Sequence, residues 1–393
     1  MDLESIQQAL RAAGLDGWLF YDFRGSDPLA CRVLGLPTGV HTTRRWFCFV
    51  PADGEPVRIV HRIESWALDH LPGKKRTYLR WQELHEAIRE TLQGVSRIAM
   101  QYSPLCAIPY ISRVDAGTLE MIRTLVPGIE IVSSGDLVQQ FEAVCSEPQY
   151  QSHRKAAELL GQLVDETFQE IGRRVRQRRK TSEYEIQRFV VEWFERHGLV
   201  TDHPPIVAVN ANSADPHYFP SAQRSSAIRA GDYVLLDVWA RLDEPDSIYA
   251  DITWVGFIGS RVPAEIEEVF GVVARARERV VAFLRERWAE GQPVRGFEAD
   301  EVARRTIEEA GYGDYFIHRT GHSIHTTTHG NGANLDSLET CDERLLLDGT
   351  CFSVEPGIYL PGRFGVRSEI NVFLWHGEVH VTGPEPQRRV LTI

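Results

Sequence analysis

The sequence predicts an α+β protein with a smaller α/β domain over residues 1–143 and a larger domain over residues 144–393. Helical and strand patterns alternate in the first part, as in layered α/β domains. From about residue 147 the two kinds of pattern are grouped instead, which is typical of an α+β domain with an antiparallel sheet. A chain of 393 residues is long enough for a large domain together with a smaller one.

The first domain is predicted to begin with an amphipathic helix over 2–13, since Leu3, Ile6 and Leu10 have helical spacing. Apolar and aromatic runs then predict strands at 17–23, 46–50, 57–60, 77–79 and 97–100, with helices at 82–93 and 111–125. No Gly-x-Gly-x-x-Gly follows a strand, which argues against a dinucleotide site.

The second domain is predicted to begin with a long helix that runs from Glu147 to about residue 179. Ser182 and Glu185 form a capping box that starts another helix, and Gly198 ends it. Further strands are predicted at 205–211, 232–240, 250–258, 350–359 and 366–374, and further helices at 263–290 and 298–310.

Composition excludes several classes of partner. The net charge of −12 argues against nucleic acid and anionic membranes. No apolar run approaches the 18 residues of a membrane span, and the N-terminus carries acids where a signal peptide needs bases. The six cysteines contain no Cys-x-x-Cys pair and read as reduced thiols. These features predict a cytoplasmic protein.

Four acids in apolar surroundings are the first candidate site residues. Asp237 and Asp251 each interrupt an apolar strand pattern, and Glu355 and Glu369 do so nearer the C-terminus. A carboxylate in such a strand is costly unless another group compensates its charge. The polar segment 241–248 predicts a hairpin that places the two aspartates on one face of the sheet.

Four histidines lie within twelve residues, at positions 318, 322, 325 and 329. On a helix they would share one face, but the glycines and threonines of this segment are weak helix formers. We therefore expect a looped or extended path, with one or two imidazoles at a metal and others at a substrate. His325 is expected to be structural. Imidazole and four carboxylates can hold two divalent cations, which can activate water for hydrolysis.

The order Asp, Asp, His, Glu, Glu, each in its local motif, resembles the metallopeptidases of the pita-bread fold. These are methionine aminopeptidase, aminopeptidase P and Xaa-Pro dipeptidase (prolidase). The resemblance covers about the last 245 residues and implies a pita-bread catalytic domain over 144–393. Residues 1–143 resemble the creatinase-type N-terminal domain of aminopeptidase P and prolidase.

The resemblance also implies roles for individual residues. Asp237 would bind one metal, Asp251 and Glu369 would bridge two, and His322 and Glu355 would complete the second site. Glu355 would also be the general base. The residues implied to act on the substrate during catalysis are His217 and His329, and those implied to bind the substrate are His318, Arg367 and Tyr359.

The activity implied by the resemblance is cleavage of the peptide bond before proline, in Xaa-Pro dipeptides or at the N-terminus of short peptides. Two divalent metal ions are implied, manganese first, with zinc, cobalt and iron left open. A homodimer is also implied. The sequence does not distinguish a dipeptidase from an aminopeptidase.

Several residues differ from the usual family pattern, which leaves the substrate preference open. Trp239 and His325 stand where the family usually has glycine, and Trp254 stands where it usually has arginine. One alternative is a creatinase-like or other small-molecule C–N hydrolase or lyase on the same fold. Another is a binding module without catalysis. The intact ligand set argues against both.

Overall fold

The computed structural model describes residues 1–37 and 42–393. The chain divides into an N-terminal unit, Met1–Glu142, and a C-terminal unit, Ala143–Ile393. This division lies one residue from the predicted boundary. Within the described residues, none of the helices has the length and apolar character needed to cross a bilayer.

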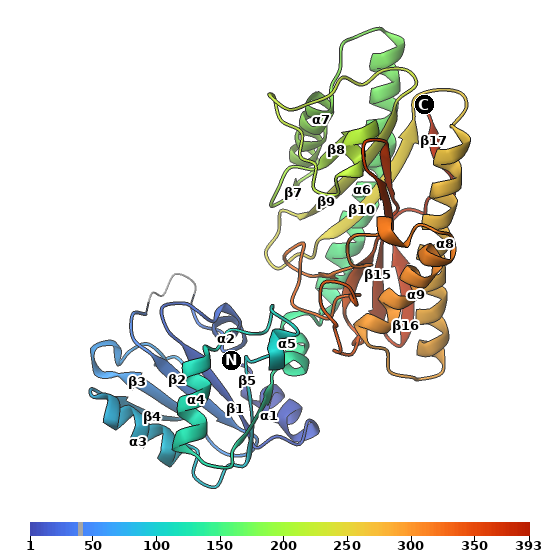
Figure 1. Cartoon of the computed structure of the whole chain (residues 1–393). Coiled ribbons are helices and arrows are strands. Elements are labelled where there is room, and N and C mark those ends of the chain that lie inside the picture. The colour runs from blue at the N-terminus through green and yellow to red at the C-terminus, as the bar shows by residue number, and fades with distance from the viewer. Residues whose placement is uncertain (38–41) are drawn as a thin grey trace. The chain divides into compact units, whose positions relative to one another are not determined.

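The N-terminal unit contains a six-stranded mixed sheet between helices (Figure 1). Its strands are β1 (Gly17–Asp22), β2 (Trp46–Pro51), β3 (Val57–His61), β4 (Lys74–Tyr78), β5 (Arg97–Met100) and β6 (Glu130–Ser133). Its helices are α1 (Leu3–Ala12), α2 (Pro28–Val33), α3 (Trp81–Thr91), α4 (Ala116–Leu125) and α5 (Gly135–Glu142), with short 3-10 turns η1 (Arg62–Glu64) and η2 (Pro104–Cys106). The strand order is β4-β3-β2-β1-β5-β6.

Side chains of β1 alternate between two hydrophobic cores, which explains why helices cover both faces of this sheet. Trp18 and Phe20 belong to the core formed with α1, α2 and α5. Leu19 and Tyr21 belong to the core formed with α3 and α4. This is the layered α/β arrangement that the alternating patterns predicted.

The predicted helix over 111–125 is too long at its N-terminal end. Helix α4 starts at Ala116 because the Asp115 side chain accepts a hydrogen bond from the backbone N–H of Thr118 and so caps the helix. Strand β6 and helices α2 and α5 were not predicted. Each has eight residues or fewer, too short for a clear periodic pattern.

The C-terminal unit combines long helices with sheets that are antiparallel apart from the parallel pair β10–β17. Its helices are α6 (Glu147–Arg176), α7 (Glu183–Arg196), α8 (Ala264–Ala289) and α9 (Gly296–Glu309), with η3 (Asn210–Ala214) and η4 (Gly313–Tyr315). Its strands are β7 (Leu199–Val200), β8 (Ile206–Val209), β9 (Tyr233–Leu242), β10 (Ala250–Phe257), β11 (Ser323–Ile324), β12 (Cys351–Val354), β13 (Gly357–Leu360), β14 (Phe364–Arg367), β15 (Ile370–Trp375), β16 (Glu378–Thr382) and β17 (Leu391–Thr392).

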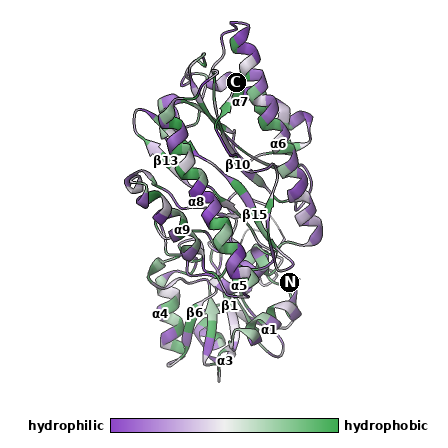
Figure 2. Cartoon of the chain, turned by 90° about the vertical axis from the view of Figure 1, so that its right-hand side faces the viewer, coloured by the Kyte–Doolittle hydropathy of each residue, from purple (hydrophilic) through white to green (hydrophobic). Residues whose placement is uncertain are grey.

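Strand β9 separates two hydrophobic cores in this unit. Val234, Leu236 and Val238 pack with α6 and α7. Leu235 and Trp239, which point to the opposite face, pack with α8, α9, β12 and β15. Helices α8 and α9 lie side by side (Figure 1). Figure 2 shows hydrophilic and hydrophobic residues mixed along α8, as expected for a helix that buries one face.

The strands predicted over 350–359 and 366–374 are each broken in the structure. The first is divided into β12 and β13 at Glu355-Pro356, and the second into β14 and β15 at Ser368-Glu369. Pro356 has no N–H to donate to a ladder, which gives a physical reason for the first break. The interpretation that Glu355 and Glu369 lie inside continuous strands was therefore wrong.

The two breaks face each other. On one side of the breaks, Val354 at the end of β12 pairs with Ile370 at the start of β15. On the other side, Gly357 at the start of β13 pairs with Arg367 at the end of β14. The two strand pairs therefore belong to different sheets, β11-β12-β15-β16 and β13-β14. Both glutamates lie where the ladder is interrupted.

A buried arginine connects the strand break at Ser368-Glu369 to helix α8. Arg277 on α8 is 1% exposed, and it donates to the Ser368 hydroxyl and, at 2.9 Å, to the Gln387 carbonyl. The Gln387 side chain in turn bonds both the N–H and the C=O of Val255 on β10, at 3.0 and 2.7 Å. These bonds hold the segment beside Glu369 in place.

The burial of the His153 imidazole should make the free energy of unfolding depend on pH. Its ring nitrogens contact the Tyr249 carbonyl at 2.7 Å and the Thr382 hydroxyl at 2.6 Å. Burial lowers the pKa of His153 to about 4 from an ordinary 6.5. Below pH 6.5 the unfolded chain takes up a proton that the native imidazole resists, so the free energy of unfolding should fall between pH 6.5 and 4. One proton corresponds to about 1.4 kcal/mol per pH unit.

Urea unfolding across this pH range measures the effect. His153→Gln removes the titrating ring, so its unfolding free energy should depend less steeply on pH than that of the wild type. If the unfolding free energy changed equally with pH in the wild type and in His153→Gln, the assignment of the pH dependence to His153 would be contradicted.

Candidate metal centre

The two aspartates meet on one hairpin. Strands β9 and β10 are antiparallel, with Asp237 opposite Thr253 and Asp251 opposite Trp239. Because directly opposed residues share a face of the sheet, both carboxylates project to the same side, as the polar loop predicted. They are 6% and 4% exposed.

The other three residues of the predicted metal site are His322, Glu355 and Glu369, and they come from the C-terminal half of the unit. These five residues are called the cluster below. His322 directly precedes β11, and its Nε2 lies 3.6 Å from Asp251 Oδ2 and 3.5 Å from Glu355 Oε1. Potential ligand atoms of Asp251, His322 and Glu369 all lie within 4.8 Å of one another. Side chains from two hairpins and one loop thus converge in the interior.

Arg367 and Thr253 connect the acids to one another. The Arg367 guanidinium contacts Asp237 and donates from Nε to Thr253 Oγ1 at 3.0 Å. The Thr253 hydroxyl donates to Glu369 Oε2 at 2.7 Å. Arg367 also lies 3.9 Å from Glu355. Arg367 therefore contacts Asp237 and lies near Glu355, and its single positive charge does not balance four carboxylates.

Burial and the neighbouring charges together determine the direction in which the pKa of each acid is shifted. Burial, followed by the charges of neighbouring carboxylates, raises the pKa of Asp251 and of Glu369 well above the ordinary range. Burial also raises the pKa of Asp237, against the opposing charge of Arg367. A cation placed among these groups would stabilise their ionised forms.

Glu355 behaves differently from the other three acids. Burial acts to raise its pKa, but His322 and His318 in their charged forms, and Arg367, hold the pKa below the ordinary value. Of these three, Arg367 keeps its charge at neutral pH. The Ser353 hydroxyl also donates to Glu355 Oε1 at 3.1 Å. Glu355 is thus kept ionised, in the form that can accept a proton.

The imidazoles at the site are held neutral. Burial lowers the pKa of His322, and it lowers the pKa of His318 to about 4. The charge of His322, followed by burial, lowers the pKa of His329 to about 3. His322 Nδ1 lies 3.2 Å from the Ser323 carbonyl. Donation from Nδ1 to that oxygen leaves the Nε2 lone pair directed at the acids, as a metal ligand requires.

A cavity of about 430 Å³ opens onto the cluster. All five members and most of the other predicted site residues line it. Those other residues are His217, His318, His329 and Arg367. Tyr359 is not among the lining residues. Its hydroxyl instead joins His318 Nε2 at 2.8 Å to Arg367 at 3.2 Å.

The histidine run follows a loop, as predicted, and includes only the two-residue strand β11. His322 and His329 are in contact, with ring centroids 4.4 Å apart. His325 is not among the residues that line the cavity, and its backbone carbonyl accepts a hydrogen bond from the Tyr249 N–H at 2.9 Å. This location agrees with a structural role for His325.

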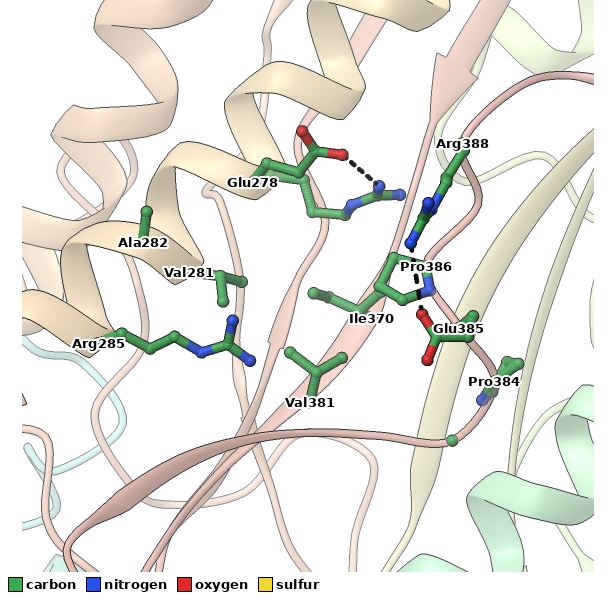
Figure 3. A pocket seen from close by; sticks show the side chains of 12 residues that line it. Glu278, Val281, Ala282, Arg285, Ile370, Val381, Pro384, Glu385, Pro386 and Arg388 are labelled. Carbon is green, nitrogen blue, oxygen red and sulfur yellow. Dashed lines mark hydrogen bonds and ion pairs between the residues drawn. The ribbon is translucent and has the colours of Figure 1, made fainter.

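A larger groove, of about 850 Å³, lies between α8 and the segment after β16 (Figure 3). Its carboxylates form ion pairs, Glu278 with Arg277 at 3.5 Å and Glu385 with Arg388 at 3.9 Å. Its described lining residues include no histidine. The groove therefore lacks the ligand chemistry of the smaller cavity.

The clustered residues fit divalent cations. Asp251 Oδ1 is buried and has no hydrogen-bond partner among the described residues, although a buried carboxylate oxygen normally has one. Carboxylate oxygens and a neutral imidazole nitrogen are suitable ligands for manganese, iron, cobalt and zinc. The fold and the cluster together describe a protein with an internal group of side chains that could hold metal ions.

Comparison with known proteins agrees with this reading. The profile described as Metallopeptidase family M24 matches residues 151–374. An Xaa-Pro dipeptidase from Pyrococcus furiosus is 31% identical over 242 residues, which are 61% of this chain and 62% of that protein. A prolidase structure from Thermococcus sibiricus aligns with a TM-score of 0.65 and 22% identity over 100% of this chain and 98% of that chain. An X-Pro aminopeptidase from Thermotoga maritima aligns with a TM-score of 0.61 and 23% identity over 100% of this chain and 99% of that chain.

The family match spans more than half of the chain and contains all five clustered side chains. The chain therefore belongs to metallopeptidase family M24, as the motifs predicted. The structural similarity over its whole length confirms the predicted α+β pita-bread fold with a smaller α/β domain at the N-terminus.

Sequence reasoning missed several residues of the site. Thr253 follows Asp251 by two positions, so strand alternation alone could have placed it on the same face. Asp202 and Thr328 also line the cavity. They carry no motif and come together only in the folded chain.

Metal binding should release protons from this site. Burial and the neighbouring carboxylates raise the pKa of Asp251 and of Glu369, so protons compete there with a metal ion, which binds the ionised carboxylates. The affinity for metal should therefore fall as pH falls. Titration calorimetry with Mn²⁺ in two buffers of different ionisation enthalpy measures the protons released.

Glu369→Ala provides the comparison. It should lower both the bound metal, measured by elemental analysis, and the proton release. Full metal content in this variant, or net proton uptake by the wild type, would contradict the assignment.

Proposed function

We propose that this metallopeptidase cleaves the peptide bond before proline, in Xaa-Pro dipeptides or at the N-terminus of short peptides. The observation that carries the proposal is the convergence of Asp237, Asp251, His322, Glu355 and Glu369 beside one cavity. The matching proteins that are named as Xaa-Pro dipeptidase, prolidase and X-Pro aminopeptidase supply the substrate class.

The five clustered side chains would hold two divalent ions. Four carboxylates and one imidazole form an oxygen-rich set, which suits manganese, while zinc, cobalt and iron remain alternatives that metal analysis would distinguish. Such ions would polarise the scissile carbonyl and lower the pKa of water towards about 7.

Glu355 is proposed as the general base. The Arg367 guanidinium near it and the Ser353 hydroxyl that donates to it favour its ionised form, so it can accept a proton from the attacking water. The same carboxyl can then donate that proton to the departing proline nitrogen, which leaves as an amine. The Ser353 hydroxyl would orient the carboxylate in both steps.

The remaining histidines and Arg367 would contact the substrate. His217 is exposed and lines the cavity, and His329 lies against His322 with a ring kept neutral by its low pKa. A neutral imidazole N–H can donate to the oxygen that develops charge in the transition state. Apolar surface from Ile206, Pro216 and Phe219 in the same cavity would receive the proline ring.

A substrate panel tests the proposed activity. Mn-loaded protein should cleave Ala-Pro or Ala-Pro-Ala and should leave Ala-Ala almost uncut. Preference for the dipeptide would identify a dipeptidase, and preference for the tripeptide an aminopeptidase. Equal rates on Ala-Pro and Ala-Ala would contradict proline specificity.

The variant His217→Ala tests whether His217 contacts the substrate rather than binding a metal ion. We expect normal metal content and a loss in kcat of about 10²–10³-fold, the typical cost of removing one donor to a developing oxyanion. His325→Ala is the matched control and should have little effect on kcat. A normal kcat in His217→Ala together with a loss in His325→Ala would reverse the assignment.

The protein is also proposed to be a homodimer. On the N-terminal unit, residues after the paired strands β3 and β4 expose apolar side chains. They are Ile63 (64% exposed), Trp66 (50%), Leu79 (45%) and Trp81 (60%). Exposed apolar residues of this size near one another are typical of an interaction surface.

Light scattering should give twice the chain mass of 44.6 kDa. The double variant Trp66→Arg/Trp81→Arg should be monomeric, whereas Leu105→Arg, at a fully exposed leucine after β5, should remain dimeric. A wild-type monomer would contradict the proposal.

We also propose a cytoplasmic location, because the six cysteines of the sequence include no Cys-x-x-Cys pair and are typical of reduced thiols. Burial raises the pKa of Cys48 and of Cys145 to about 12, so these thiols stay protonated and unreactive.

A further inference from the structure

One acid on the cavity wall does not belong to the metal-binding cluster. Asp202 lies in the loop between β7 and β8, lines the cavity, and has a side chain that is 42% exposed. The five clustered residues account for the metals without it. Its carboxylate is therefore accessible to a molecule that enters the cavity.

Two neighbouring side chains orient this carboxylate. Trp239 donates from Nε1 to Asp202 Oδ1 at 2.8 Å, and the Thr328 hydroxyl lies 3.2 Å from Oδ2 and 3.3 Å from Oδ1. Trp239 is only 8% exposed, so its indole is fixed by packing. It also stands opposite Asp251 in the β9–β10 ladder. Asp202 is thus held on the side of the cavity next to Asp251.

The carboxylate retains acceptor capacity on its open side. An ionised carboxylate offers about four lone-pair positions, and Trp239 and Thr328 do not fill them. His203 Nδ1, at 3.6 Å, is beyond hydrogen-bond distance. A cationic group in this space would have a fixed, charged acceptor.

The proposed reaction supplies such a cation close to the cluster. When the first peptide bond of a chain is cut, the α-ammonium group is two bonds from the scissile carbonyl carbon. A substrate whose carbonyl lies at the cluster must therefore place its ammonium beside it. The three donor hydrogens of an ammonium match a carboxylate that still has free acceptor positions.

We propose that Asp202 binds the α-ammonium group of the substrate's first residue, and that Trp239 and Thr328 position it for this contact. The inference rests on the proposed function and assigns a selectivity for peptides with a free N-terminus. Trp239 and Thr328 are positioning residues that act through Asp202. A hydrogen bond between charged groups should lower KM more than it raises kcat, because the ammonium is present in both ground and transition states.

Asp202→Asn tests the inference with little change in shape, because the amide oxygen can still accept from Trp239. Ala-Pro is compared with propionyl-proline, which lacks only the amino group. The assay measures kcat and KM for both compounds on Mn-loaded protein, or an inhibition constant for propionyl-proline where turnover is too slow. Bound manganese is measured in parallel.

We expect Asp202→Asn to raise KM for Ala-Pro about 10- to 100-fold, with kcat changed less than KM and manganese content unchanged. Its handling of propionyl-proline should equal that of the wild type. Trp239→Phe, which removes the N–H donor, should raise KM for Ala-Pro in the same direction but by less. Glu339→Gln is the control, since Glu339 is another exposed acid of the cavity lining and should leave KM unchanged.

An unchanged KM for Ala-Pro in Asp202→Asn would overturn the inference while the proposed function stands. So would an equal rise in KM for Glu339→Gln, which would mean that the general negative potential attracts the substrate. Loss of manganese in Asp202→Asn would also overturn it, because the residue would then act through the metal site. A wild-type protein that cleaves no Xaa-Pro peptide would overturn the proposed function and, with it, the inference.

Discussion

The close approach of four carboxylates, three of them buried and Glu355 nearly so, is the constraint on which the candidate metal centre depends. Asp237, Asp251, Glu355 and Glu369 converge in the interior, and Arg367 is the cation in contact with them. Burying unpaired charge is expensive, so the site favours either protonation or bound cations. The pKa values of Asp251 and Glu369 are raised by burial and by the neighbouring carboxylates, as expected for such a site. Cations in the site would lower the cost of burying these charges, and this couples metal binding to stability.

The strands position these four carboxylates in two different ways. The aspartates come from regular positions on the β9–β10 hairpin, where alternation alone puts them on one face. The glutamates come from facing interruptions of the ladder, at Glu355-Pro356 and Ser368-Glu369. A regular strand alternates its side chains between faces, whereas an interruption allows the side chain to turn. Hydrogen bonds from the Glu355 N–H to the Thr320 carbonyl (2.7 Å) and from the Glu369 N–H to the Thr253 carbonyl (3.3 Å) satisfy the backbone at these points.

Most of the site could be predicted from the sequence because charge in an apolar pattern is a strong signal. The five proposed ligands came from that signal and from the order of motifs, and the looped path of the histidines came from the weak helix formers around them. The strand breaks were missed. Pro356 marks the first break in the sequence, but the apolar residues on both sides of Glu355 favoured one continuous strand. Asp202 could not be predicted either, because its partner Trp239 lies 37 positions away. Such contacts are set by tertiary packing and leave no local pattern.

We infer that the cluster formed by the four carboxylates and His322 holds two metal ions. Anomalous diffraction at the manganese edge, from crystals of Mn-loaded protein, tests this inference. Two anomalous peaks are expected between the side chains of Asp237, Asp251, His322, Glu355 and Glu369. A single peak there, or peaks only at other residues, would contradict the two-metal assignment.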